Sequence, residues 1–173
     1  MAKKNIKLLV LAALFTALTT VATMVIQIPS PMSGYVNLGD TLVLLSAWVL
    51  GPFVGAAAGG IGSMLADIIT GYAYYAPGTL IIKALMGLVA GLLFRAVSKK
   101  QGSRSVFAAR LTGGLAAEII MVVGYFGYAA LILQNGIGAL ASVPGNVIQG
   151  LVGLVAALAL AQILTKAKAL PEL

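Results

Sequence analysis

Six apolar stretches run along the chain, and turn-forming residues separate them. The stretches cover about residues 6–26, 38–50, 53–71, 77–97, 108–133 and 142–165. The turn signals between them include Pro29-Ser30-Pro31, Gly51-Pro52, Pro77-Gly78 and Asn135-Gly136. Most stretches hold about 20 residues, which is enough for a helix to cross roughly 30 Å of hydrocarbon. The pattern therefore predicts an all-α integral membrane protein with six transmembrane helices.

The stretch 38–50 is short, at roughly 20 Å of helix, and the charge pattern decides whether it crosses the membrane. Ten of the eleven basic residues lie in three segments, 3–7, 95–110 and 166–168. Because basic segments favour the cytoplasmic side, an even number of crossings must separate the first two. Counting 38–50 as a crossing satisfies this condition. We therefore expect one compact six-helix bundle over residues 1–173, with both termini cytoplasmic.

Composition supports a membrane protein and narrows its chemistry. Hydrophobic residues make up 61% of the chain, charged residues 9%, and the mean hydropathy is +1.07, far outside the range of soluble domains. The net charge of +7 would suggest nucleic acid in a soluble protein, but basic residues that flank apolar spans follow the positive-inside rule. We therefore expect a multi-pass membrane protein with no nucleic-acid partner.

Two absences from the sequence limit its chemistry further. The chain contains neither cysteine nor histidine, which argues against thiol and imidazole catalysis and against the usual zinc or copper sites. We expect no metal. The lysine-rich start resembles a signal peptide, but the apolar run after it is long and no clean small-residue cleavage site precedes Gln27. We therefore expect a retained first helix.

Lys83 is the one basic residue deep inside an apolar stretch, so it marks a candidate site. A charge within the bilayer is costly unless it is paired or faces a wet cavity. Asp67, near the end of the third predicted helix, and Lys83, near the start of the fourth, lie at similar depth by helix rise. They can therefore reach each other, either as a structural ion pair or as contacts for a polar ligand.

Glu118 lies near the middle of the fifth predicted helix, where no basic residue has an obvious matching depth. Burial favours the neutral form of a carboxyl group, which can then donate a hydrogen bond. Three roles stay open for it. Glu118 binds a ligand or joins a polar network with Lys83, or it carries protons, or it forms a simple hydrogen bond between helices.

Two pairs of polar residues are spaced three apart. Asn146 and Gln149 follow Pro144 at the start of the sixth predicted helix and share one helical face. Their amides suit a heteroaromatic ligand with ring nitrogens and hydroxyls. Asn37 and Asp40 repeat the spacing at the start of the second predicted helix, where Asp40 is either an N-terminal cap or a ligand contact.

Tyrosines gather near the turn between the third and fourth predicted helices and on the fifth. They are Tyr72, Tyr74, Tyr75, Tyr125 and Tyr128. Such residues either form an interfacial belt or stack on a flat ligand. The polar and aromatic groups together predict a pocket that opens outward, of the kind that binds small molecules. The loop at 27–38 is long enough to close over its mouth as a lid.

Four segments of the chain carry a resemblance to a known family. They are Gly34-Tyr-Val-Asn-Leu-Gly-Asp40, Leu50-Gly-Pro-Phe-Val-Gly-Ala56, Gly59-Gly-Ile-Gly-Ser-Met-Leu-Ala-Asp67 and Tyr75-Ala-Pro-Gly-Thr-Leu-Ile-Ile-Lys83. In these segments the chain resembles the substrate-binding (S) subunits of energy-coupling factor (ECF) transporters. Within that family it is similar to the riboflavin-type branch, which also includes proteins for hydroxymethylpyrimidine and pyridoxine-like vitamins.

The resemblance implies a multi-pass location in a bacterial-type plasma (inner) membrane, and it implies partners for this chain. S subunits bind a vitamin from outside and dock on a transmembrane coupling subunit that two cytoplasmic ATPases drive. The chain has no Gly-x-x-x-x-Gly-Lys-Ser/Thr loop, so we expect ATP to be used by the partner subunits, with no cofactor and no enzyme activity in this chain. In the family an Ala-x-x-x-Ala face of the first helix contacts the coupling subunit, and Ala13 and Ala17 match that pattern.

We therefore expect the S subunit of an ATP-driven importer that binds a pyridoxine- or hydroxymethylpyrimidine-like ring, or riboflavin. The family's ligand sites lie in the outer half of the bundle, which fits Lys83, Glu118, Asn146 and Gln149. The alternative is a stand-alone proton-coupled secondary transporter. It would use Glu118 and the Asp67/Lys83 pair as its relay.

Overall fold

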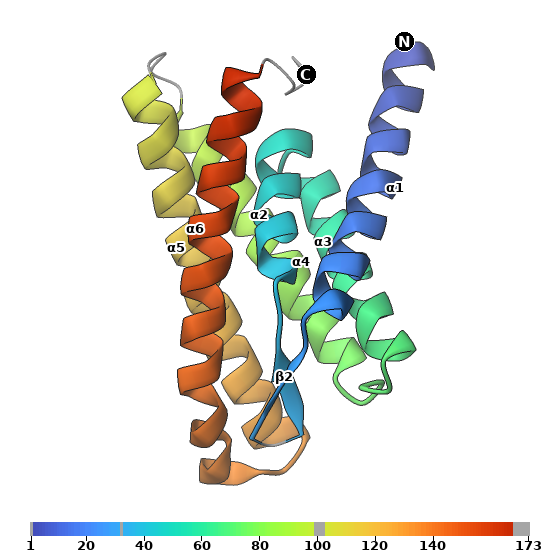
Figure 1. Ribbon diagram of the computed structural model, residues 1–173, viewed down its shortest axis with the longest axis vertical. Coiled ribbons are helices and arrows are strands. Elements are labelled where there is room, and N and C mark those ends of the chain that lie inside the picture. Colours follow the sequence, from blue (N-terminus) through green and yellow to red (C-terminus); the bar gives the residue numbers. More distant parts are fainter. Residues whose placement is uncertain (1, 32, 99–102, 168–173) are drawn as a thin grey trace.

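The computed structural model describes residues 2–31, 33–98 and 103–167, and these residues form six α-helices and one β-hairpin (Figure 1). The helices are α1 (Ala2–Val25), α2 (Gly39–Leu50), α3 (Pro52–Ile69), α4 (Ala76–Val97), α5 (Ser103–Gly127) and α6 (Val143–Lys166). The hairpin pairs β1 (Ile28–Ser30) with β2 (Gly34–Val36). A π-helical turn, η1 (Tyr128–Ile132), and a 3₁₀ segment, η2 (Gly136–Ser142), connect α5 to α6.

Helix lengths confirm a multi-pass membrane protein. Within the described residues, five helical segments are long and apolar enough to cross a membrane, and α2 is the shorter apolar helix. With 12 residues, α2 measures roughly 18 Å. The start of α1, the end of α4, the start of α5 and the end of α6 lie at one end of the bundle (Figure 1), which agrees with an even number of crossings between the basic segments.

The segment 27–38, predicted to be a loop that closes over the pocket as a lid, contains the β-hairpin. Its strands are antiparallel, with Ile28 opposite Val36 and Ser30 opposite Gly34. Proline fixes φ and lacks an N–H donor, so Pro29 disfavours continuation of α1 and suits a short edge strand. The hairpin extends from α2 along the bundle, away from the end that holds the chain termini (Figure 1). The hairpin and α2 together therefore extend further along the bundle than the short helix does alone (Figure 1).

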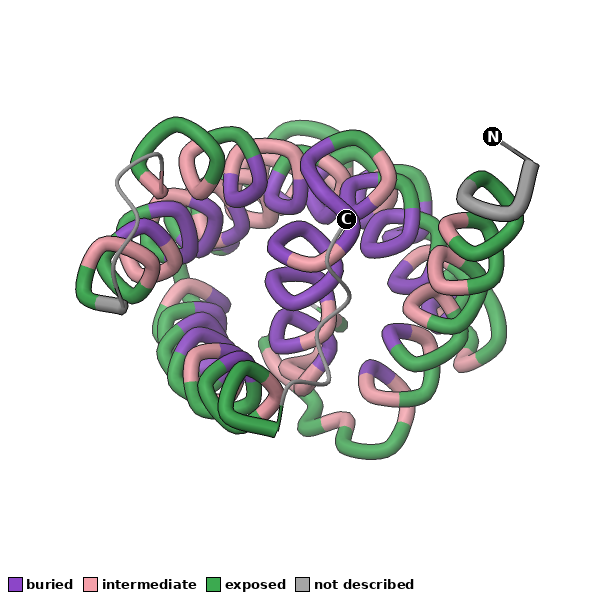
Figure 2. The backbone as a smooth tube through the Cα atoms, turned by 90° about the horizontal axis from the view of Figure 1, so that it is seen from above, coloured by how far each residue is buried: buried purple, intermediate pink, exposed green. Residues whose placement is uncertain are grey.

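The centre of the bundle is α2. It packs against α1, α3, α4, α5 and α6, and seen from above a mostly buried helix stands within a ring of the others (Figure 2). The side chains of Val43, Leu44 and Ala47 are fully buried. Because α2 is enclosed, it needs no polar face, which explains its nearly continuous apolar sequence.

Small residues on α3 and α4 allow the helices to approach closely. A Cβ atom added to Gly55 would lie 2.5 Å from the Cα of Ala47 on α2. One added to Gly91 on α4 would lie 2.6 Å from the Cα of Pro52. These are contacts with backbone, which cannot rotate away as a side chain does.

Replacing Gly55 by alanine is therefore expected to lower the free energy of unfolding by about 1–3 kcal/mol, because α2 and α3 must separate to admit the methyl group. Unfolding of the purified protein in mixed detergent micelles would measure the loss. The matched control is Gly127→Ala, since a Cβ atom there meets nothing within 4 Å. Equal stability of the two variants would contradict the close α2–α3 contact.

Candidate functional site

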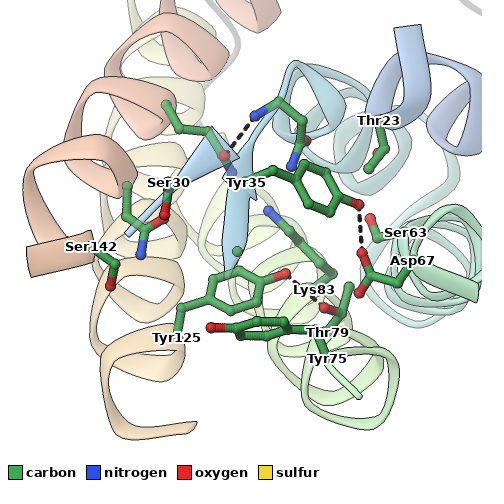
Figure 3. A pocket seen from close by; sticks show the side chains of 14 residues that line it. Thr23, Ser30, Tyr35, Ser63, Asp67, Tyr75, Thr79, Lys83, Tyr125 and Ser142 are labelled. Atoms are coloured by element: carbon green, nitrogen blue, oxygen red, sulfur yellow. Dashed lines mark hydrogen bonds between the residues drawn. The ribbon is translucent and has the colours of Figure 1, made fainter. Parts of the chain in front are cut away.

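A polar cavity lies between the β-hairpin and helices α1, α3, α4, α5 and α6 (Figure 3). Seven residues that the sequence singled out line it: Asn37, Asp67, Tyr75, Lys83, Tyr125, Asn146 and Gln149. The cavity volume is only ≈ 30 Å³, far below the roughly 300–1,000 Å³ of most small-molecule pockets. A ring-sized ligand therefore requires the hairpin or its neighbours to move.

Lys83 forms its ion pair with Asp40, and the predicted pairing with Asp67 is wrong. The Nζ of Lys83 contacts the Oδ1 of Asp40, and both side chains are at least 99% buried. Helix rise placed Asp67 at a suitable depth, but depth leaves the direction around each helix axis undetermined. The central position of α2 brings Asp40 to Lys83 instead.

Asp40 is also not the N-terminal cap of α2. Leu38 occupies the cap position, and no side chain caps the helix there. The second carboxylate oxygen of Asp40 accepts a hydrogen bond from the Nε2 of Gln149 at 2.7 Å. The Oε1 of Gln149 in turn accepts one from the backbone N–H of Asn37 at 2.8 Å. Asp40 therefore holds Gln149, which lines the cavity, but Asp40 itself does not line it.

Asp67 lies at the side of the cavity formed by α1 and α3. Its Oδ1 accepts a hydrogen bond from the hydroxyl of Tyr35 on β2 (Figure 3). Its Oδ2 is buried and has no hydrogen-bond partner among the described residues. The hydroxyl of Thr79 and the charge of Lys83 lie near enough to interact with this carboxyl group. The Oδ2 of Asp67 therefore accepts no hydrogen bond from the described residues, although Asp67 lines the cavity.

Aromatic rings enclose the cavity near Lys83. The Nζ of Lys83 lies 5.5 Å from the ring centroid of Tyr125, within cation–π distance. The Tyr125 hydroxyl donates to the Oγ1 of Thr79 at 3.0 Å. The Tyr75 ring lies 6.3 Å from that of Tyr125. Burial, with smaller effects of Tyr74, Tyr128 and Asp67, raises the pKa of the Tyr75 hydroxyl, which therefore stays protonated.

Tyr74 holds the hairpin and does not line the cavity. Its hydroxyl donates to the backbone carbonyl of Ser33 at the hairpin tip. Its ring centroid lies 6.2 Å from that of Tyr72, which in turn lies 4.5 Å from that of Tyr35. These tyrosines therefore join the 70–75 connection to the hairpin.

Glu118 lies outside the polar cavity, in an apolar groove between α5 and α6. Its side chain is buried, and neither carboxyl oxygen has a hydrogen-bond partner among the described residues. It lies against Gly150 and Gly153 of α6, and Gly153 also adjoins the Cβ of Asp40. Glu118 interacts electrostatically with Asp40 and Lys83, so it adjoins that pair without a hydrogen bond to it.

The sequence analysis missed several polar residues that line the cavity. They are Thr23, Ser30, Tyr35, Ser63, Thr79 and Ser142. Single hydroxyl groups are too common in membrane helices to stand out. One available signal was the four-residue spacing of Ser63 and Asp67, which places both on the same face of α3.

Ala13 and Ala17 lie on an exposed face of α1. This helix packs against α2 and α3, and large apolar residues such as Leu9, Leu14 and Val21 remain exposed on it. The prediction that Ala13 and Ala17 meet a partner subunit therefore concerns a surface that the described residues leave exposed.

Comparison with known proteins gives consistent results. The family model described as "ECF-type riboflavin transporter, S component" matches residues 3–166. The chain is 30% identical over 168 residues to "Thiamine precursor transporter HmpT" of Lactococcus lactis subsp. cremoris (strain MG1363), covering 96% of this chain and 92% of that protein. It is 37% identical over 148 residues to "Uncharacterized protein in gap 3'region" of Pyrococcus woesei, covering 85% of this chain and 94% of the relative.

A solved structure shares the fold. It is described as "Structure and mechanism of the S component of a bacterial ECF transporter" and superimposes with a TM-score of 0.67 at 20% identity. The match covers 94% of this chain and 97% of the other. At that identity the likeness concerns the arrangement of the helices.

Proposed function

Because this chain belongs to the family of ECF-type riboflavin transporter S components, we propose that it captures a small vitamin or vitamin precursor in the polar cavity for import. The observation that supports this function is the cavity itself, which gathers amide, hydroxyl, carboxylate and tyrosine groups inside an apolar bundle. A few convergent polar groups within an apolar surround are typical of small-molecule sites. The buried Lys83–Asp40 pair keeps the wall of this site in place.

The ligand we propose is a compact ring of the hydroxymethylpyrimidine or pyridoxine type. The cavity has little free volume, so a single ring needs less rearrangement than the three-ring flavin with its ribityl chain. Asn146 and Gln149 supply amides that can pair with ring nitrogens and hydroxyls. A relative at 30% identity is named a thiamine precursor transporter, and hydroxymethylpyrimidine is the pyrimidine half of thiamine.

We propose that transport requires partner subunits: a transmembrane coupling subunit and two cytoplasmic ATPases. The chain contains no phosphate-binding Gly-x-x-x-x-Gly-Lys-Ser/Thr loop, so the ATP would be bound and hydrolysed by those partners. The exposed apolar face of α1 around Ala13 and Ala17 is the surface proposed to meet the coupling subunit. Reconstitution with and without those partners tests this assignment.

Calorimetric titration of the purified protein with hydroxymethylpyrimidine, pyridoxine and riboflavin tests the ligand. We expect one of the small rings to bind more tightly than riboflavin. Asn146→Ala is expected to weaken that binding about tenfold, because one hydrogen bond to the ring is lost, while the folded state keeps its stability. Tight riboflavin binding, seen as quenching of flavin fluorescence, with no binding of the small rings would overturn the ligand assignment.

A proton-coupled secondary transporter is the second candidate, and the buried Glu118 supports it. A carboxyl group without a hydrogen-bond partner among the described residues can exchange a proton within the bilayer. Uptake by the isolated chain in proteoliposomes, abolished when the proton gradient is collapsed, would favour this function. Uptake that requires the ATPases and ignores the gradient would exclude it.

A further inference from the structure

Three buried polar side chains on the α1 and α3 side of the cavity have atoms without hydrogen-bond partners. They are the Oγ1 of Thr23, the Oγ of Ser63 and the Oδ2 of Asp67, which all lack a partner among the described residues. The three side chains are at least 97% buried and all line the polar cavity. Buried polar groups in folded proteins are nearly always paired, so their grouping at one cavity indicates a partner from outside the chain.

The hydrogen-bonding properties of these three groups indicate which kind of chemical group can bind to them. An ionised carboxylate only accepts hydrogen bonds, whereas a hydroxyl both donates and accepts. Tyr35 already donates to the Oδ1 of Asp67, and Lys83 is ion-paired with Asp40. The Thr79 hydroxyl and the charge of Lys83 interact with the carboxyl group of Asp67, but no described residue donates a hydrogen bond to its Oδ2.

We propose that Thr23, Ser63 and Asp67 form a subsite that binds an amino or protonated amine group of the transported molecule, with the Oδ2 of Asp67 as acceptor. This proposal rests on the proposed function, because it concerns the ligand of the same cavity. It adds the orientation of the ring. The amino group points toward α3, and the opposite edge meets Asn146 and Gln149, which line the cavity from α6.

The subsite also excludes a class of ligands. Among the described residues that line the cavity, Lys83 is the one cation, and its charge is compensated by Asp40. A carboxylate or phosphate group on the ligand would add a negative charge beside Asp67, which is unfavourable in a low-dielectric site. Phosphorylated or carboxylated forms of the vitamin are therefore expected to bind poorly.

Matched ligand pairs test the subsite on the full-length protein in detergent. One pair is 4-amino-5-hydroxymethyl-2-methylpyrimidine and the same ring with hydrogen in place of the amino group. A second set is pyridoxamine, pyridoxine and 4-pyridoxate. We expect the amine of the preferred ring class to bind roughly 10- to 100-fold more tightly than its matched analogue, as for a hydrogen bond to a charged group, and the carboxylate to bind most weakly.

Asp67→Asn is expected to reduce this preference to a few-fold while affinity for the analogue without the amine stays nearly unchanged. Asn146→Ala is the matched control, since it should weaken both ligands and leave their ratio intact. If Asp67→Asn does not fold, Ser63→Ala provides the same comparison with a smaller expected change in the ratio.

The possible outcomes separate the two proposals. Binding of a small ring without preference for its amine, or a preference that survives Asp67→Asn in a folded protein, overturns the subsite and leaves the proposed function standing. Binding of none of these rings overturns both. Loss of the preference in Asp67→Asn, with the control ratio unchanged, supports the subsite.

Discussion

Replacing Lys83 by methionine is expected to lower the free energy of unfolding by about 3–5 kcal/mol, because it leaves a buried carboxylate without its cation. The partner is Asp40, which is 0% exposed and lies in the first turn of the central helix α2. Methionine keeps most of the length of the lysine side chain, so packing changes little. Equilibrium unfolding in mixed detergent micelles would measure the effect.

The double variant Asp40→Asn/Lys83→Met isolates the ion pair. An uncharged amide in place of Asp40 can still accept a hydrogen bond from Gln149, so we expect most of the stability to return. Lys166→Met, at an exposed position in the last turn of α6, is the control and should leave stability unchanged. If Lys83→Met alone were as stable as the wild type, the Lys83–Asp40 pair would not stabilise the bundle.

The same double variant decides between the two roles of Lys83. Binding of the vitamin ring by a folded Asp40→Asn/Lys83→Met protein would assign Lys83 to the structure of the cavity wall. Loss of binding in that folded protein would assign it a direct ligand contact as well. The comparison is informative because Lys83 both pairs with Asp40 and lines the cavity.

Replacing Ala17 by leucine is expected to abolish uptake while ligand affinity stays unchanged. Ala17 lies on the exposed face of α1, and a small residue there lets the backbone of another helix approach closely. A leucine side chain would hold the proposed coupling subunit away. The measurements are vitamin uptake by cells that produce all subunits and calorimetric titration of the isolated variant.

Ala159→Leu is the matched control for Ala17→Leu. Ala159 is equally exposed but lies on α6, away from the proposed docking face, so its uptake should match the wild type. Parallel loss of uptake and binding in Ala17→Leu would contradict a separate docking role. Wild-type uptake by Ala17→Leu would place the coupling subunit elsewhere on the chain.

Much of the fold could be predicted because the relevant signals are local. The length of each apolar stretch fixes whether a helix can span the bilayer, and proline and glycine mark the ends, as Pro52 and Gly51 do between α2 and α3. At Gly51 the backbone turns with φ of +87°, a conformation that favours glycine. The hairpin escaped prediction because its strands are three residues long and pair only with each other.

The candidate site was predicted less completely, because its contacts join residues far apart in the chain. Asn37, Asp67, Lys83, Asn146 and Gln149 were found because polar residues in apolar helices stand out, and all five line the cavity. Their partners were not predictable. Rise along the axis estimates depth, whereas the rotation of each helix and its neighbours depend on packing.

The sequence by itself determined that this chain is a multi-pass helical membrane protein with costly polar groups within its spans, because apolar length and buried charge have local energetic consequences. Only the tertiary structure decided which groups meet. It enclosed α2 at the centre, paired Lys83 with Asp40 instead of Asp67, and turned Glu118 away from the cavity into the groove between α5 and α6. The physical reason is that close packing of six helices sets the rotation of each one, and that rotation decides which side chains share a buried space.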